Sequence, residues 1–120
     1  MNKIFMAFLA AAVLSAGCAS RPAFTCTPLK NVTMPKGAVL IDVRTQKEYD
    51  ERHIVGAVLI PRDKIRERIG AVAADRNTPI YLYCRSGRRA DEARRELNGL
   101  GYRSVVNLCG IEAAEAALKK

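Results

Sequence analysis

The sequence lacks tryptophan, contains a single histidine, His53, and has no Cys-x-x-Cys pair among its four cysteines. Structural zinc sites are built from closely spaced cysteine and histidine ligands, so a zinc site here would need scattered ones. We therefore expect no metal and no cofactor. The absence of helix-turn-helix and zinc-finger spacing also argues against nucleic acid as a partner.

Long apolar runs are also scarce, apart from residues 4–14, which follow Lys3 and are too short to span a membrane. A charged start, such a run and small residues before Cys18 are typical of an export signal. The sequence predicts a lipoprotein-type signal peptide over residues 1–17. Cys18 would then be the lipidated first residue of a periplasmic, membrane-anchored protein, with Ala19 favouring the outer membrane. Cleavage near Ala19, giving a soluble periplasmic protein, is the alternative.

Acidic residues are few: 12 Asp and Glu stand against 20 Lys and Arg, which gives a formal charge of +8. Loss of Lys3 with the signal peptide would leave +7. General solubility or attraction to anionic surfaces could explain such an excess. However, several arginines are concentrated in one short stretch: Arg85, Arg88, Arg89, Arg94 and Arg95. This clustering favours a local anion-binding site.

The 120 residues, 49% of them apolar, suit one small domain. Prolines interrupt the polar residues 18–36, which we interpret as a tether with a first strand near residues 29–32, before a domain over 37–120. In that domain apolar runs predict buried strands at 38–41, 57–60, 80–83 and 104–108. Helix-patterned segments alternate with them at 45–50, 62–72, 90–98 and 111–118. This alternation predicts an α/β fold with a central, mostly parallel sheet and helices on both faces.

Cys84 directly follows the strand at 80–83 and opens a short basic loop before the next helix. Such a loop directs backbone N–H groups and the positive end of the helix dipole at one point. A thiol there should have a pKa below the usual value of about 8.5, which favours the nucleophilic thiolate. Asp42 and Cys109 also end predicted strands and should lie on the same rim of the sheet.

The loop spacing excludes one class of cysteine enzyme. Phosphatases of related fold use Cys-x5-Arg, and the position that the arginine would occupy is Ala90. The shorter loop after Cys84 suits a sulfur donor better than phosphate.

Four segments together resemble the rhodanese domain. They are residues 40–44, 53–61, 84–89 and 101–108, which read LIDVR, HIVGAVLIP, CRSGRR and GYRSVVNL. The size and the export signal resemble the small single-domain periplasmic thiosulfate sulfurtransferases of the phage-shock type. Two departures stand out: the family often has Gly-Gly where this chain has Cys109-Gly110, and the following tryptophan is missing.

The resemblance implies that Cys84 carries sulfur as a persulfide, taken from a small anionic donor such as thiosulfate and passed to cyanide or a thiol. The implied substrate-binding residues are those of the loop: Arg85, Ser86, Gly87, Arg88 and Arg89. Among the arginines we favour Arg85 and Arg88, because Arg89 is expected to begin the helix and point outward. A non-catalytic sulfur- or anion-sensing module on the same scaffold is an alternative function.

Two pairs of polar residues and one histidine are expected to have structural roles. Asp42 and Arg44 should form a charge pair that fixes the end of the first central strand. Thr45 and Glu48 have the spacing of a capping box for the helix at 45–50. His53 should pack against the following turn rather than act in catalysis.

The cysteines left after lipidation of Cys18 allow three arrangements. Free thiols at Cys26 and Cys109 are our first expectation, and a Cys26–Cys109 disulfide is the second. The third makes Cys109 a resolving thiol for Cys84, which would give a thiol redox protein instead of a sulfurtransferase.

Overall fold

The computed structural model describes residues 23–119 of the chain. The predicted signal peptide and Cys18 lie outside the described residues. In residues 23–119, none of the helices combines the length and the apolar character that crossing a membrane requires.

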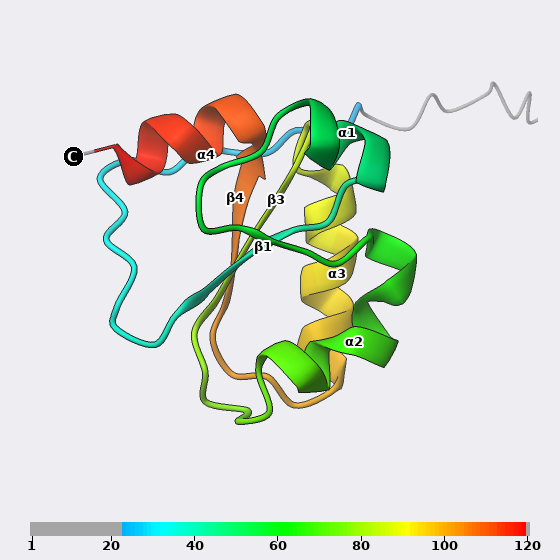
Figure 1. The fold of residues 1–120 in the computed structure, drawn as a ribbon. Coiled ribbons are helices and arrows are strands. Elements are labelled where there is room, and N and C mark those ends of the chain that lie inside the picture. The colour runs from blue at the N-terminus through cyan, green and yellow to red at the C-terminus, as the bar shows by residue number, and fades with distance from the viewer. Residues whose placement is uncertain (1–22, 120) are drawn as a thin grey trace, which may run out of the picture.

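A four-stranded parallel sheet forms the centre of the domain, in the order β2-β1-β3-β4 (Figure 1). Its strands are β1 (Val39–Asp42), β2 (Val58–Leu59), β3 (Ile80–Cys84) and β4 (Val105–Gly110). Central strands β1 and β3 are almost wholly buried because helices cover both of their faces. The predicted strand at 57–60 is shorter than expected, since β2 is an edge strand that pairs only with β1.

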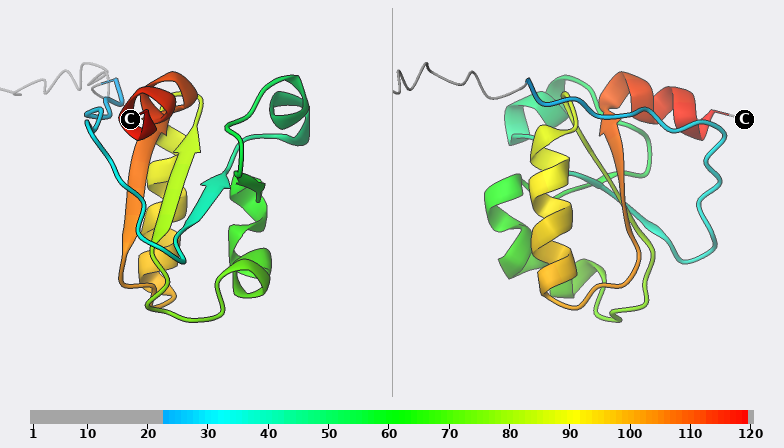
Figure 2. Two further views of the ribbon diagram at one scale, coloured as in Figure 1. Left: turned by 60° about the vertical axis from the view of Figure 1, so that its left-hand side comes forward. Right: turned by 180° about the vertical axis from the view of Figure 1, so that it is seen from behind.

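The helices are α1 (Gln46–Glu51), α2 (Ile65–Val72), α3 (Arg88–Gly99) and α4 (Ile111–Leu118), with a 3₁₀ turn at Arg62–Lys64. Residues of α2 and α3 bury their apolar side chains with one face of the sheet, and α4 packs on the other face (Figure 2). This confirms the predicted α/β class with helices on both faces. The predicted capping box is also present, because the Thr45 and Glu48 side chains each accept the other's backbone N–H.

The predicted strand at residues 29–32 is wrong. The segment contains no strand and runs beside α4, where the Val32 N–H donates to the Ala117 carbonyl at 2.8 Å (Figure 2). A helix carbonyl is the partner of this donor, so the segment does not extend the sheet. Apolar side chains such as Val32 and Met34 instead complete the hydrophobic cluster under α4.

An irregularity interrupts the pairing of β3 with β4 near their carboxyl ends. Leu82 is opposite Asn107, whereas Cys84 is opposite Gly110, so β4 contains one residue more than β3 over this interval. Cys109 lies in this β-bulge with φ of +73°, in the left-handed region that non-glycine residues rarely adopt. The bulge lies directly beside Cys84.

Candidate functional site

Cys84 is at the carboxyl end of β3, and its side chain is completely buried. The chain then turns through Gly87, which has φ of +94° and caps the N-terminus of α3. The Gly87 N–H donates to the Cys84 Sγ at 3.0 Å. A backbone donor and the positive end of a twelve-residue helix both stabilise negative charge at this sulfur.

Glycine is required at two positions around Cys84 by close packing. A Cβ added at Gly87 would lie 2.9 Å from the Cβ and Sγ of Cys26. One added at Gly110 would lie only 2.4 Å from the Arg85 carbonyl oxygen. The loop after Cys84 is thus enclosed between the start of the described chain and the end of β4.

Cys26 and Cys109 form a disulfide, with their Cα atoms 5.8 Å apart. Our first expectation, free thiols at both positions, is therefore wrong. The sequence could not reveal the proximity because 83 positions separate the two cysteines, and only the path of residues 23–32 past the β4 bulge brings them together. Cys84 is the free cysteine of residues 23–119, so the redox alternative lacks its resolving thiol in this state.

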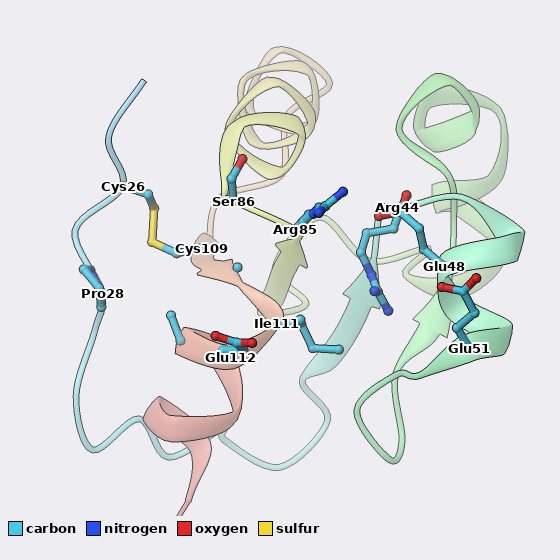
Figure 3. Close-up of a pocket in the computed structure, with 12 residues that line it drawn as sticks. Cys26, Pro28, Arg44, Glu48, Glu51, Arg85, Ser86, Cys109, Ile111 and Glu112 are labelled. Atoms are coloured by element: carbon cyan, nitrogen blue, oxygen red, sulfur yellow. A yellow bond between two sulfur atoms is a disulfide. The ribbon is translucent and has the colours of Figure 1, made fainter. Parts of the chain in front are cut away.

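A cavity of about 600 Å³ opens between the Cys84 loop, α1 and the first turn of α4 (Figure 3). Arg85 and Ser86 contribute its wall on the loop side, while Cys84 itself does not line it. Other charged lining residues come from the far walls: Arg44, Glu48, Glu51 and Glu112. The Cys84 sulfur is thus not part of the cavity wall.

The three loop arginines have different environments. Arg85 is exposed, lines the cavity and makes no ion pair with any residue in the described range 23–119. Arg88 is the first residue of α3, and its side chain is 70% exposed, with Nε 4.0 Å from Glu92. Arg85 is thus available to an anion in the cavity, whereas Arg88 faces solvent. The earlier preference for Arg88 is not supported by this geometry.

Arg89 does not point outward, which corrects the expectation for this residue. Its guanidinium makes two hydrogen bonds to the Glu48 carboxylate, at 2.7 and 3.0 Å. The hydrogen bond from Arg89 holds the pKa of Glu48 at about 2, and the same pair raises the pKa of Arg89. Arg89 therefore ties the start of α3 to α1, because Glu48, the acidic residue of the α1 capping box, is also its charge partner.

The expected Asp42–Arg44 pair is present at the end of β1. Asp42 is fully buried, and its carboxylate accepts hydrogen bonds from the Arg44 backbone N–H, Nε and Nη2 at 2.7 to 3.1 Å. Arg44 Nη2 also donates to the Arg52 carbonyl. The Asp42 hydrogen bonds raise the pKa of Arg44. The pair thus joins the end of β1 to the chain beyond α1 and holds the cavity wall.

His53 is exposed and stacks on the Tyr49 ring at a centroid distance of 3.7 Å. Its Nδ1 is 2.8 Å from the Tyr49 carbonyl oxygen. It does not line the cavity beside Cys84. Across residues 23–119, no three His, Cys, Asp or Glu side chains gather closely enough to hold a metal ion.

Asn107 is a site residue that the sequence reasoning missed. Its Nδ2 donates to the Gly87 carbonyl at 2.9 Å, and its Oδ1 accepts from the Cys109 N–H at 2.8 Å. One amide therefore joins the Cys84 loop to the β4 bulge. The available signal was a polar residue inside the apolar run at 104–108, where an unpaired amide would be costly.

Comparison with known families identifies this arrangement. The family model described as "Rhodanese-like domain" matches residues 27–117. Thiosulfate sulfurtransferase PspE of Escherichia coli (strain K12) is 36% identical over 72 residues, which cover 60% of this chain and 69% of that protein. Thiosulfate sulfurtransferase GlpE of Coxiella burnetii is 32% identical over 72 residues, covering 60% of this chain and 65% of the relative.

Some relatives are much longer than the matched region. The putative sulfur carrier protein YrkF of Bacillus subtilis is 36% identical over 69 residues, but these cover only 36% of that protein. Among solved structures, a rhodanese with anions from E. coli has a TM-score of 0.62 at 34% identity. The match covers 63% of this chain and 89% of the E. coli chain. A rhodanese-like domain protein from Staphylococcus aureus has a TM-score of 0.59 at 30% identity, covering 66% and 76%.

Proposed function

The chain belongs to the rhodanese-like domain family, and on that premise we propose that it is a sulfurtransferase that carries sulfur on Cys84. The donor we propose is thiosulfate, and the acceptor is cyanide or a thiol. Relatives named thiosulfate sulfurtransferases support the donor class. The main structural support for this proposal is the free Cys84 sulfur, which accepts a hydrogen bond from the Gly87 N–H at the N-terminus of α3.

The proposed reaction has two displacement steps at sulfur. The Cys84 thiolate attacks the outer sulfur of thiosulfate, the S–S bond of the donor breaks, and sulfite leaves with the bonding electron pair. Cys84 then holds the outer sulfur as a persulfide anion. Cyanide attacks that sulfur, forms thiocyanate and returns the electron pair to the Cys84 thiolate. A thiolate acceptor would react in the same way and leave as a persulfide.

The loop favours this chemistry through charge. The Gly87 N–H and the α3 dipole stabilise the thiolate before attack and again after sulfur leaves. Arg85 is the proposed anion-binding side chain, because it faces the cavity and no other described residue neutralises it. Since Cys84 is buried, the donor reaches Sγ when Arg85 and Ser86, both exposed, move aside. Arg89 serves the site by fixing the start of α3 rather than by touching the donor.

The test is thiocyanate formation from thiosulfate and cyanide by the wild-type protein and by Cys84→Ala. We expect turnover in the wild type, a mass increase of one sulfur atom on the Cys84 peptide after thiosulfate alone, and neither result in the variant. Arg94→Ala is a matched control that removes a paired arginine of α3 outside the cavity lining. Thiosulfate binding without turnover would instead support an anion-sensing module.

We also propose that the protein acts in the periplasm as a lipoprotein anchored through Cys18, with a soluble periplasmic form as the alternative. The support is the apolar run at 4–14 followed by small residues before Cys18. If the protein is anchored, cell fractionation should find the mature wild type in the membrane fraction. The Cys18→Ala variant should instead be released into the periplasm or be retained as a precursor. Equal release of both proteins with the periplasmic contents would contradict anchoring.

A further inference from the structure

The Cys26–Cys109 disulfide is packed directly on the loop that follows Cys84. A Cβ at Gly87 would lie 2.9 Å from the Cys26 Sγ and 3.0 Å from the Cys109 Cα, so the loop backbone and the disulfide are in close contact. Gly87 is itself buried. The loop therefore cannot move toward the β4 bulge while the disulfide is intact.

Asn107 holds the same glycine from the sheet side. Its Nδ2 donates to the Gly87 carbonyl, and its Oδ1 accepts the N–H of Cys109, the disulfide residue in the bulge. Both polar atoms of the amide are thus used, one on the loop and one on the bulge. A shift of the bulge would displace Asn107 and, through it, Gly87.

The bulge has an unfavourable backbone conformation that its surroundings maintain. Cys109 has φ of +73°, where a non-glycine residue is under strain. The bond to Cys26 fixes its side chain, Asn107 fixes its N–H, and the next residue, Gly110, packs against the Arg85 carbonyl. Without the disulfide, the bulge would lose one of these constraints and could relax.

We propose that the disulfide and Asn107 form a brace that positions Gly87, the residue whose N–H donates to the Cys84 sulfur. Here the brace means Cys26, Cys109 and Asn107, which are positioning residues because they act through Gly87, the donor to the Cys84 sulfur. The inference deepens the proposed function and rests on it for its kinetic readout. When the brace is lost, the Gly87 N–H moves away from the Cys84 sulfur, and the thiolate loses this donor, which lowers the reactivity of Cys84.

Two variants of the full-length protein remove different parts of the brace. Cys26→Ala/Cys109→Gly removes the disulfide, and the new glycine accepts the positive φ without strain. Asn107→Leu keeps the disulfide and a similar side-chain size but loses both hydrogen bonds. Tyr102→Phe is the control, because Tyr102 contacts Ala73 and Arg76 at the opposite end of the sheet. It lowers stability without touching the loop.

Two quantities are measured for each protein. The first is the rate of Cys84 alkylation by iodoacetamide at neutral pH, followed by mass spectrometry of the peptide that contains Cys84. The second is kcat for thiocyanate formation. We expect the alkylation rate of both brace variants to fall about tenfold, the size of a lost hydrogen bond to a charged group. We expect kcat to fall about tenfold, as small misplacements of reacting groups cause.

The control and the two readouts separate the possible results. An unchanged alkylation rate and kcat in Asn107→Leu would overturn the proposal. An equal loss in Tyr102→Phe would also overturn it, because the effect would then reflect stability alone. If the double cysteine variant does not fold, Asn107→Leu decides alone. If the wild type forms no thiocyanate but the brace variants are alkylated more slowly than it is, the brace is supported and the proposed sulfur transfer is contradicted.

Discussion

The two ends of the parallel sheet are built on different principles. At the carboxyl ends of the strands, Gly87 and Gly110 are crowded by neighbouring backbone or disulfide atoms, and the positive φ of Cys109 adds strain. At the amino ends, Gly101 also has a positive φ, but a Cβ added there would meet its nearest atoms, in the Arg76 side chain, at ordinary distances of 3.8 Å or more. Crowding therefore occurs at the end that carries Cys84.

Polar groups show the same difference. At the amino ends, the Tyr102 hydroxyl donates to the Ala73 carbonyl at 2.5 Å and accepts from Arg76, whose guanidinium also covers the Tyr102 ring. These groups satisfy one another. At the carboxyl ends, Arg85 faces a cavity without an ion-pair partner in residues 23–119. An end that satisfies its own polar groups stabilises the fold, and an end that leaves one free can bind a ligand.

The largest expected effect comes from closing the crowded space. Gly110→Ala would place a Cβ 2.4 Å from the Arg85 carbonyl, so the loop after Cys84 must move. We expect thiocyanate formation to fall by about tenfold or more, because about 1.4 kcal/mol of lost positioning has that effect. The matched control is Gly99→Ala at the amino side, where a Cβ meets nothing within 4 Å. Equal activity of both variants would show that the crowding has no functional value.

The next effect tests the unpaired charge. Arg85→Ala should raise KM for thiosulfate about tenfold, since charge-assisted hydrogen bonds contribute about 1.5–3 kcal/mol. Arg88→Ala, which removes a neighbouring exposed arginine, should change KM by no more than about twofold. Steady-state kinetics of both variants give the answer. A larger effect for Arg88 would mean that the donor binds outside the cavity.

The Glu48–Arg89 pair predicts a dependence of stability on pH. The pKa of Glu48 in the folded protein is about 2, below its ordinary 4.5, so the stabilisation is complete above about pH 4.5 and is lost as the pH falls toward 2. Relative to Glu48→Gln, whose amide can still serve the capping box, we expect a wild-type advantage on the order of 2 kcal/mol at neutral pH, allowing for partial exposure. Urea unfolding at pH 7 and pH 2.5 measures it. An advantage that is as large at the lower pH as at pH 7 would contradict the ion pair as its cause.

The smallest effect is expected at the amino ends. Tyr102→Phe removes the donor to a buried carbonyl and should lower the free energy of unfolding by about 1 kcal/mol. Because Tyr102 is remote from the cavity lining, kcat/KM for thiosulfate should not change. Denaturant titration and kinetics on the same preparation provide both values. A loss of activity larger than the loss of stability would mean that the two ends are coupled.

Much of the carboxyl-end site could be inferred from local sequence. Cys84 follows an apolar run and precedes a helix pattern, and the Thr45 to Glu48 spacing indicated a capping box. Asp42 and Arg44 are only two positions apart in the sequence, so local geometry suffices to form the pair. These features depend on neighbours along the chain, which is why the sequence predicts them.

The inferences that failed depend on distant segments. Arg89 was expected to face outward, but its partner Glu48 lies 41 positions earlier and reaches it only after α1 and α3 have packed at one end of the sheet. Residues 29–32 were expected to form a strand, yet they lie along α4, where the Ala117 carbonyl accepts the Val32 N–H. The role of Asn107 was not predicted, because one of its hydrogen-bond partners, Gly87, lies in a distant loop and the other, Cys109, lies in a bulge that the sequence does not reveal.

From residue 38 onward, the sequence alone determined the alternation of strands and helices and the place of Cys84 at a strand end, because periodicity and turn residues act over short distances. Its motifs gave the resemblance to one family. Only the tertiary structure decided that Cys26 joins Cys109, that Arg89 pairs with Glu48, and that Asn107 links the bulge to the loop. Each of these contacts joins segments that the parallel crossovers bring to one end of the sheet, and no local pattern specifies which side chains meet there.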